Sequence, residues 1–438
     1  MNEKKIDVII VGAGPAGIAA GITLARANKK VLMVERGSFA GAKNVFGGAV
    51  YVDSICELFP NFLEKGPIER FNTNHKYALL TEKESTVIEY KANKERKNSC
   101  SVIRAKFDKW CIEEAQKAGA YFAPNTVVRE LIVENNKVIG IKTDLENYYA
   151  NIVIIADGVN SLLAKQLKMR KNIEPKNVAL AVKEVIKIDK KILEERFNLD
   201  EKTGCVYEFI GYPMNKVLGL GFLYTNKDSI SIGLGIGLED LKKHKLNVND
   251  ILEKLKKHPL ISPLIKDGEL LEYRAHLIPE GGYKNIPKLY DNGVMIVGDA
   301  AMLVNNLHWE GTNLAITSGK IAAQTAIDAI NNNDFSDKQL SKYQKELAKS
   351  YVIKDLKTYK NILSNIEART ESFFGYWPKK IAEFFEIFTK VDLKPKKQEF
   401  HRYICSWFKE RGLNQLIYDI YTIIKSIIGV LKWQLMTN

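Results

Sequence analysis

The sequence predicts an α/β fold: a parallel sheet assembled from separated segments, an inserted antiparallel sheet, and a helical C-terminal region. Three observations predict it. Short apolar runs at 6–11, 151–155 and 294–297 each lead directly into a Gly- or Asp-containing turn, as buried strands of a parallel sheet do. Strand-like runs occupy most of residues 178–237, and from residue 336 onward the pattern is helical and rich in aromatic residues.

Length and composition limit the number of domains and the kinds of partner that the chain can have. A chain of 438 residues has room for two or three domains. Its net charge is +13, and from Lys338 on there are 19 Lys or Arg against 10 Asp or Glu, so nine of the thirteen charges lie in the tail. A basic tail suits an anionic partner or membrane surface, or a solvated face. No basic helix with interleaved aromatic residues appears, so nucleic acid is not expected as a partner.

Cysteine spacing and the N-terminus bear on metals and location. The five cysteines are Cys56, Cys100, Cys111, Cys205 and Cys405, and none forms a C-x-x-C pair. We therefore expect no metal site and no iron–sulfur cluster held by this chain alone. The first residues lack the layout of a secretory signal, which favours a cytoplasmic location.

The first motif, GAGPAG at 12–17, follows the strand at 6–11 and opens a helix expected from Pro15 to about Asn28. Glycines here allow a tight turn and close approach of a pyrophosphate, whose charge is stabilised by the helix N-terminus. Glu35 ends the next strand, 31–35, about 20 residues on, where a carboxylate bonds a ribose hydroxyl. These features together predict a dinucleotide site.

Two further turns place carboxylates after buried strands. ADGVNS at 156–161 contains Asp157, and GDAA at 298–301 contains Asp299. Ligands of open α/β sheets bind at the carboxyl ends of the strands. GLGIG at 233–237 lacks the spacing of a second dinucleotide motif and lies within a strand pattern, so no separate pyridine-nucleotide domain is expected.

The three segments in this order resemble the glutathione-reductase-type FAD fold, a Rossmann-type fold, in its hydroxylase-like branch. The resemblance implies an FAD-binding domain from 1–75, 100–165 and 290–335, a substrate domain from 76–99 and 166–289, and a helical region from 336–438. It implies that Asp299 bonds the ribityl chain and that Arg104 lies near the phosphates or ribityl. The FAD-binding residues predicted on these grounds are Gly12, Gly14, Pro15, Ala16, Gly17, Glu35, Arg36, Lys43, Asn44, Gly47, Gly48, Arg104, Val128, Asp157, Gly158, Gly298, Asp299, Gly311, Thr312 and Asn313.

For two sets of these residues, the residue types themselves give a physical reason for a place beside the flavin. Gly47 and Gly48, with Gly41, would let the backbone approach the isoalloxazine ring, although a surface loop would also explain them. Gly311-Thr312-Asn313 opens a helix expected to run to Asn331, and its N-terminus suits negative charge on the reduced flavin.

Further stretches narrow the resemblance to the electron-transfer-flavoprotein:quinone oxidoreductases, in their short FixC type. They are GAKNVFGGAVY (41–51), IRAKFDKWCIEEAQKAGA (103–120), LGFLYTNKDSISIGLGIGLED (220–240), IPEGGYKNIPKL (278–289) and 298–326. The resemblance implies FAD as cofactor, a two-subunit electron-transfer flavoprotein as donor, and a membrane quinone as acceptor. Because long members carry a four-cysteine cluster domain that this chain lacks, it also implies a separate ferredoxin-like iron–sulfur partner. In such assemblies the donor can be electron-bifurcating.

The resemblance points to a quinone site near a strand with the sequence FLY. The matching residues are Gly219, Leu220 and Phe222, with Tyr212 and Met214 as candidate wall residues. Leu220 replaces a glycine of the family pattern. No catalytic acid or base is assignable, since an isolated histidine such as His308 is more often structural. The alternative is a geranylgeranyl-reductase-like enzyme that saturates isoprenoid lipids, but residues 205–213 depart from the aromatic pattern of those reductases.

The C-terminal segment 415–436 is mostly apolar with one polar stripe that includes Asp419, Thr422, Lys425 and Ser426. Several charges argue against a spanning helix, and an amphipathic helix on a membrane or a partner is expected. The alternative is a helix packed on the chain's own core. A quinone substrate favours a peripheral position on the inner face of the cell membrane.

Overall fold

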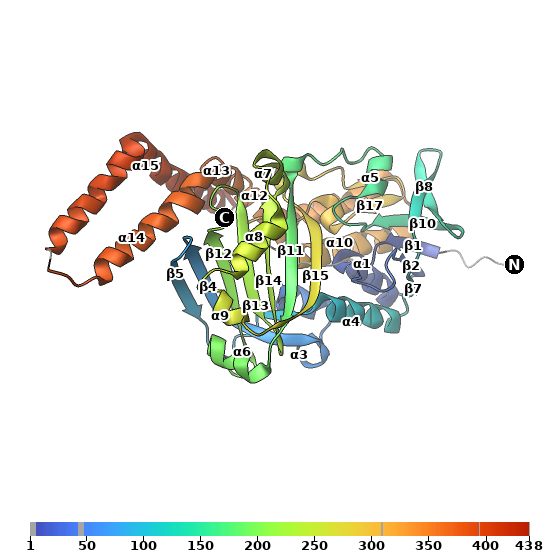
Figure 1. The fold of residues 1–438 in the computed structure, drawn as a ribbon. Coiled ribbons are helices and arrows are strands. Elements are labelled where there is room, and N and C mark those ends of the chain that lie inside the picture. The colour runs from blue at the N-terminus through green and yellow to red at the C-terminus, as the bar shows by residue number, and fades with distance from the viewer. Residues whose placement is uncertain (1–5, 43–47, 308–309, 394, 438) are drawn as a thin grey trace.

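The computed structural model describes the backbone of residues 6–42, 48–307, 310–393 and 395–437, and side chains within these ranges except those of 363 and 427–437. Two sheets dominate the described chain, and a helical C-terminal hairpin projects away from them (Figure 1). The predicted residues Lys43, Asn44, Gly47 and His308 lie outside the described residues.

The first sheet is the dinucleotide-type sheet. Its strands run in the order β16-β17-β10-β1-β2-β7, and the pairs from β17 to β7 are parallel. A β8–β9 hairpin extends β10. The bounds are β1 Ile6–Val11, β2 Val31–Val34, β7 Tyr121–Ala123, β8 Val128–Glu134, β9 Lys137–Thr143, β10 Asn147–Ile155, β16 Tyr290–Asp291 and β17 Val294–Ile296. Apolar side chains on both faces of β1 and β10 are buried, so both faces of this sheet are covered by other parts of the chain.

Two long helices pack together beside this sheet. They are α1 (Pro15–Arg26) and α10 (Thr312–Asn331). A Cβ on Gly319 would lie 2.1 Å from the carbonyl oxygen of Ala16, so the two helices approach at the distance that only glycine allows. The pair therefore brings the starts of both helices to the carboxyl ends of the parallel strands.

The second sheet is mainly antiparallel, in the order β15-β11-β14-β13-β12-β4-β6-β3, with β5 on β4. Its strands are β3 Ala49–Tyr51, β4 Ile68–Leu80, β5 Ser85–Lys91, β6 Ser99–Val102, β11 Val178–Lys187, β12 Thr203–Gly211, β13 Gly219–Thr225, β14 Ser229–Gly237 and β15 Glu269–Pro279. β4 runs through the expected domain boundary at residue 75, and β3 and β6 join this sheet although both come from segments assigned to the FAD domain. The domain division itself remains a prediction.

The two faces of the second sheet have different surroundings. Its outer face packs under short helices in a second apolar cluster that contains Leu193, Phe197, Ile251 and Leu255. These helices include α6 (Lys190–Phe197), α7 (Leu238–Lys243), α8 (Val248–Lys256) and α9 (Ser262–Ile265). The inner face is turned toward the first sheet. Side chains alternate between the two faces along each strand, which decides which residues can meet a ligand between the sheets.

The remaining helices connect and extend these layers. Those near the first sheet are α2 (Val52–Leu58), α3 (Phe62–Lys65), α4 (Arg104–Lys117) and α5 (Leu162–Gln166). The C-terminal region contains α11 (Asp337–Lys349), α12 (Tyr351–Tyr359), α13 (Ile362–Glu367), a π-helical turn (Glu371–Tyr376), α14 (Trp377–Thr389) and α15 (Lys396–Thr437). Gly412 interrupts α15 with a φ of 73°, so α15 is two helices joined at a kink.

α14 and the first half of α15 form the hairpin at the left of Figure 1. Where it begins, the π-helical turn packs against β12 and α14 packs against β4 and β5. None of the helices in the described part of the chain has the length and apolar character needed to cross a bilayer.

Candidate functional site

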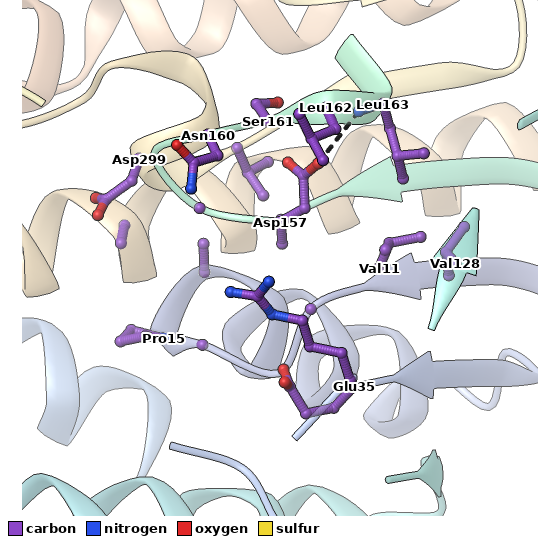
Figure 2. Close-up of a pocket in the computed structure, with 18 of the residues that line it drawn as sticks. Val11, Pro15, Glu35, Val128, Asp157, Asn160, Ser161, Leu162, Leu163 and Asp299 are labelled. Carbon is purple, nitrogen blue, oxygen red and sulfur yellow. Dashed lines mark hydrogen bonds between the residues drawn. The ribbon is translucent and has the colours of Figure 1, made fainter. Parts of the chain in front are cut away.

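A cavity of about 490 Å³ lies between the two sheets at the carboxyl ends of the parallel strands. In Figure 2 the turn from Asp157 to Leu163 and Asp299 line one wall, and Pro15 and Glu35 line the facing wall. The structure places most of the predicted FAD residues around this cavity: Gly12, Gly14, Pro15, Ala16, Glu35, Arg36, Arg104, Val128, Asp157, Gly158, Asp299, Gly311 and Thr312.

The glycine turn after β1 packs against its neighbours without room for side chains. Gly12 has a φ of +105°, and a Cβ there would lie 2.2 Å from the carbonyl oxygen of Ala156. Gly17 does not line the cavity, and a Cβ on it would lie 2.0 Å from the carbonyl oxygen of Gly12. The third glycine of the motif therefore serves helix packing, which brings the start of α1 to the cavity.

Two helix N-termini meet at this cavity. α1 begins after Gly14 and α10 after Gly311, and neither N-cap residue makes a side-chain capping hydrogen bond. Amide groups of an uncapped first turn need external acceptors, and the helix dipole favours anionic ones. The cavity therefore fits a ligand with a diphosphate and a second electron-rich group, as FAD has.

Glu35 is held in place before any ligand binds. Its Oε2 accepts a hydrogen bond from the backbone N–H of Ala13 at 3.0 Å, and its Oε1 accepts one from the N–H of Gly37 at 2.7 Å. Carboxylate oxygens have further lone pairs. The fixed carboxylate can therefore accept the hydroxyls of a ribose at the position that the motif predicts.

Two carboxyls on the wall opposite Glu35, those of Asp299 and Asp157, have raised pKa values. Burial raises the pKa of Asp299 to about 6, although the nearby guanidinium groups of Arg104 and Arg170 act in the opposite direction. Burial also raises the pKa of Asp157, to whose Oδ2 the backbone N–H of Leu163 donates at 3.4 Å. Carboxyls in such surroundings are stabilised when they hydrogen-bond to hydroxyl groups, and the ribityl chain of FAD offers these.

The predicted residues that do not line the cavity have structural neighbours. Gly298 has a φ of +61°, and a Cβ there would lie 2.8 Å from the Cβ of Ala16. A Cβ on Gly48 would lie 2.2 Å from the Tyr224 hydroxyl, and Asn313 is buried in the first turn of α10. Position 48 therefore requires glycine because Tyr224 of β13 fills the space that a side chain would need, whether or not a flavin lies beside it.

Three residues of the second sheet also line the cavity, and the sequence did not predict them. His276 and Ile278 lie on β15, and Glu280 follows its end. Burial raises the pKa of Glu280 to about 8 and lowers that of His276. The stretch IPEGGY was part of the family resemblance, but no function could be assigned to its residues from the sequence. Only the folded sheet shows that Ile278 and Glu280 reach the cavity.

The predicted quinone residues divide between the two faces of the second sheet. A Cβ on Gly219 would lie 2.9 Å from Cγ1 of Ile236 and 3.1 Å from Sδ of Met214, both in the outer-face cluster. Tyr212 packs against the same cluster, with its ring 6.2 Å from that of His258. By alternation along β13, Leu220 and Phe222 belong to the inner face.

A row of side chains crosses the inner face beside Phe222. The register pairs Phe222 with Glu208 on one side and with Gly233 on the other, and Glu208 pairs with Tyr77 of β4. Burial raises the pKa of Glu208. Burial raises the pKa of the Tyr51 hydroxyl at the end of β3, and the charges of Glu310 and then Glu208 raise it further, so Tyr51 lies near this row. The row therefore combines aromatic rings with one protonatable carboxyl.

The described residues contain no group of three or more His, Cys, Asp or Glu side chains placed to hold a metal ion.

Comparisons with known proteins agree with this arrangement. The family model of FAD-dependent oxidoreductases matches residues 7–166, and the model described as ETF-QO, ubiquinone-binding matches residues 178–278. Protein FixC of Bradyrhizobium diazoefficiens is 40% identical over 96% of this chain and 98% of its own length. A probable electron transfer flavoprotein-quinone oxidoreductase of Escherichia coli is also 40% identical, with the same coverage.

Solved structures confirm the Rossmann-type FAD fold with an inserted sheet. A geranylgeranyl bacteriochlorophyll reductase-like protein of Thermoplasma acidophilum aligns with a TM-score of 0.71 at 22% identity, covering 89% of this chain and 92% of that one. The myxobacterial halogenase CndH aligns with a TM-score of 0.65 at 15% identity, covering 97% of both chains. At these identities the likeness concerns the fold alone.

Proposed function

This chain belongs to the FixC family of FAD-dependent oxidoreductases, and on that basis we propose that it passes electrons from an electron-transfer flavoprotein, through its FAD, to a membrane quinone. A ferredoxin-like iron–sulfur protein is the proposed second partner, because the described residues of this chain offer no cluster ligands. The observation that carries the proposal is the ubiquinone-binding match to residues 178–278, which form most of the sheet that faces the cavity.

The inner-face row at Phe222 is the proposed place for the quinone headgroup. Phe222 stacks on Tyr224, with ring centroids 5.5 Å apart and planes 15° apart, and the pair presents a flat apolar surface. Quinone reduction takes up two protons with two electrons, and bound FAD supplies the electrons. Glu208, whose pKa burial raises, can hold a proton beside Phe222 for transfer to a quinone oxygen.

Membrane contact is supported by the orientation of the second half of α15. Its polar residues Asp419 and Thr422 are buried against the protein. Leu416 is also buried, but the other described apolar residues of this half are exposed: Leu413, Ile417, Tyr418, Ile420, Tyr421, Ile423 and Ile424. An amphipathic helix that packs on its own core has the opposite orientation, so the exposed side is suited to the interface of a bilayer.

The tip of the α14–α15 hairpin also exposes apolar side chains. Phe388, Val391 and Leu393 are 63%, 94% and 105% exposed, and Lys390, Lys396 and Lys397 lie among them. Apolar side chains flanked by lysines suit an anionic lipid surface. Because α14 packs beside β4 and β5, the hairpin adjoins the Tyr77 end of the inner-face row, where a quinone from the bilayer would enter.

The alternative function is saturation of an isoprenoid lipid by a geranylgeranyl-reductase-like enzyme. The fold suits both functions, so the likeness to the Thermoplasma protein does not separate them. The ubiquinone-binding match favours the quinone.

Anaerobic reoxidation of the flavin tests the proposal. The bound FAD is reduced, mixed with a short-chain menaquinone or ubiquinone analogue, and followed by its absorbance. We expect rapid reoxidation that saturates with quinone concentration. If the flavin is not reoxidised, even with the ferredoxin-like partner present, the quinone assignment is wrong. Turnover of a geranylgeranyl lipid would then be tested.

A further inference from the structure

Lys183 is a buried amine without a partner among the described residues. It lies in the middle of β11 and is 3% exposed, yet it makes neither a hydrogen bond nor an ion pair there. Lys380, which is equally buried, instead pairs with Glu383 at 2.7 Å and Glu410 at 2.9 Å. Because an unpaired buried ammonium is costly, Lys183 requires an explanation.

The direction of Lys183 follows from its neighbour in β11. Glu184 pairs with Lys256 of α8 at 2.9 Å, so Glu184 lies on the outer face. Lys183 therefore lies on the inner face, as does Ala181 two residues before it. Ala181 pairs with His276 of β15, which lines the cavity, and Lys183 pairs with Gly233, where a Cβ would lie 2.5 Å from Cζ of Phe222, so the Phe222 ring covers this glycine.

The charges around Lys183 leave one positive charge in excess. Burial lowers the pKa of its amine to about 8; Glu272 and Asp108 act in the opposite direction, and Arg104 and Arg274 act in the same direction as burial. Each of these arginines has its own acid: Arg104 pairs with Asp108 at 3.0 Å and Arg274 with Glu272 at 2.9 Å. Lys183 is thus the third cation in a group with two carboxylates; it does not itself line the described cavity, but its neighbour Arg104 does.

We propose that Lys183 contacts bound FAD and stabilises the negative charge that its ring system gains on reduction. Two electrons and one proton leave a reduced flavin with one negative charge, which matches the single excess cation beside Phe222 and Gly233. The electron donor is the flavoprotein of the proposed function, or dithionite in a test. The inference depends on FAD as the cofactor but not on quinone as the acceptor.

The test compares Lys183→Met, Lys183→Gln and Lys183→Arg with the wild-type holoprotein in an anaerobic redox titration without quinone. We expect the uncharged variants to bind reduced FAD about tenfold less tightly relative to oxidised FAD, which corresponds to about 30 mV in the midpoint potential of a two-electron couple. Lys183→Arg should restore most of the potential. Lys256→Met, on the outer face of the same sheet, is the matched control and should leave the potential unchanged.

Three results would overturn the proposal. One is an unchanged potential in Lys183→Gln with FAD fully bound. Another is an equal loss of affinity for both oxidation states, which would indicate general FAD binding or a structural role. The third is a higher KM for quinone with an unchanged potential, which would assign the amine to the acceptor. If Lys183→Met does not retain FAD, Lys183→Gln and Lys183→Arg decide the question, with thermal unfolding of each apo form as the folding control.

Discussion

The indole Nε1 of Trp377 donates a hydrogen bond to the carboxylate of Asp419 at 3.1 Å, joining the start of α14 to the second half of α15. The same carboxylate, which is fully buried, pairs with Arg369 and with Arg411. This one side chain therefore holds the polar side of α15 against the protein and leaves its apolar side outward.

Asp419→Asn should loosen the C-terminal region without affecting FAD. Removing one member of a buried ion pair costs about 3–5 kcal/mol, because it leaves the arginines without their charge partner. Hydrogen exchange should accelerate in 369–424, and the flavin spectrum should not change. Glu386→Gln, an exposed residue of α14, is the control. Unaltered exchange in Asp419→Asn would mean that packing alone holds α15.

Charged substitutions at the hairpin tip should weaken membrane binding. Phe388→Glu and Leu393→Glu each remove an exposed apolar side chain whose burial contributes roughly 1.5–3 kcal/mol, so each should reduce vesicle binding about tenfold or more. Cosedimentation with vesicles that contain an anionic phospholipid measures this. Leu145→Glu, 79% exposed in the β9–β10 turn, is the matched control. Equal binding by all three variants and wild type would remove the tip from the membrane contact.

Glu35→Ala should weaken FAD binding. The change removes the acceptor for the N–H of Ala13 and Gly37 and for a ribose hydroxyl. Hydrogen bonds to charged groups contribute roughly 1.5–3 kcal/mol, so we expect a tenfold to hundredfold higher Kd. Fluorescence titration of the apo protein with FAD measures it. Glu57→Ala, an exposed acid of α2, should leave the Kd unchanged.

Glu280 should make the apo protein less stable as pH rises. Burial raises its pKa from 4.5 to about 8, so the folded state favours the protonated form. This contribution is fully present below pH 4.5 and is lost as pH rises toward 8. The carboxyl faces a cavity that water enters when FAD is absent, which moderates the effect. Urea unfolding of apo Glu280→Gln should therefore show a flatter decline between pH 5 and 8 than wild type, and parallel curves would contradict the prediction.

Phe222 and Gly219 should behave differently as quinone-site candidates. Phe222→Leu removes an aromatic ring from the inner face and should raise the KM for quinone several-fold with little loss of stability. Gly219→Ala would force a methyl group against Ile236 and Met214 and cost about 1–3 kcal/mol of stability. Steady-state kinetics and thermal unfolding of both variants separate the two effects. A quinone-specific KM increase in Gly219→Ala alone would reverse the assignment.

The parallel sheet and most of the cavity could be predicted from the sequence, because each part is a local signal. A strand, a glycine turn and a helix follow one another within about 30 residues, as at Gly12 and Glu35, and their chemistry does not depend on the rest of the chain. The strand pairing of the second sheet could not be predicted in this way. β4 pairs in parallel with β12, some 130 positions later in the chain, and no local pattern specifies such a partner.

The sequence also did not show which face of a strand, or which side of a helix, meets the rest of the protein. Gly219 and Phe222 are three residues apart in one strand, so alternation places them on opposite faces, but only the packing of β13 shows which of the two faces is turned toward the first sheet. A helical wheel likewise divides α15 into a polar and an apolar side without saying which side meets the protein. The ion pairs of Asp419 decide this in favour of the polar side.

The interleaving of the two sheets has a consequence for how this chain is made. β1 is synthesised before its neighbour β10, which ends at Ile155, and β17 at Val294–Ile296 joins the parallel sheet only later. Between them the chain supplies β3, β4 and β6, and then β11 to β15, to the other sheet. The second sheet cannot be completed before β15 has been made as far as Pro279, nor the first before β17 has been made as far as Ile296. Nascent chains should therefore expose long apolar strands and depend on chaperones until β17 emerges.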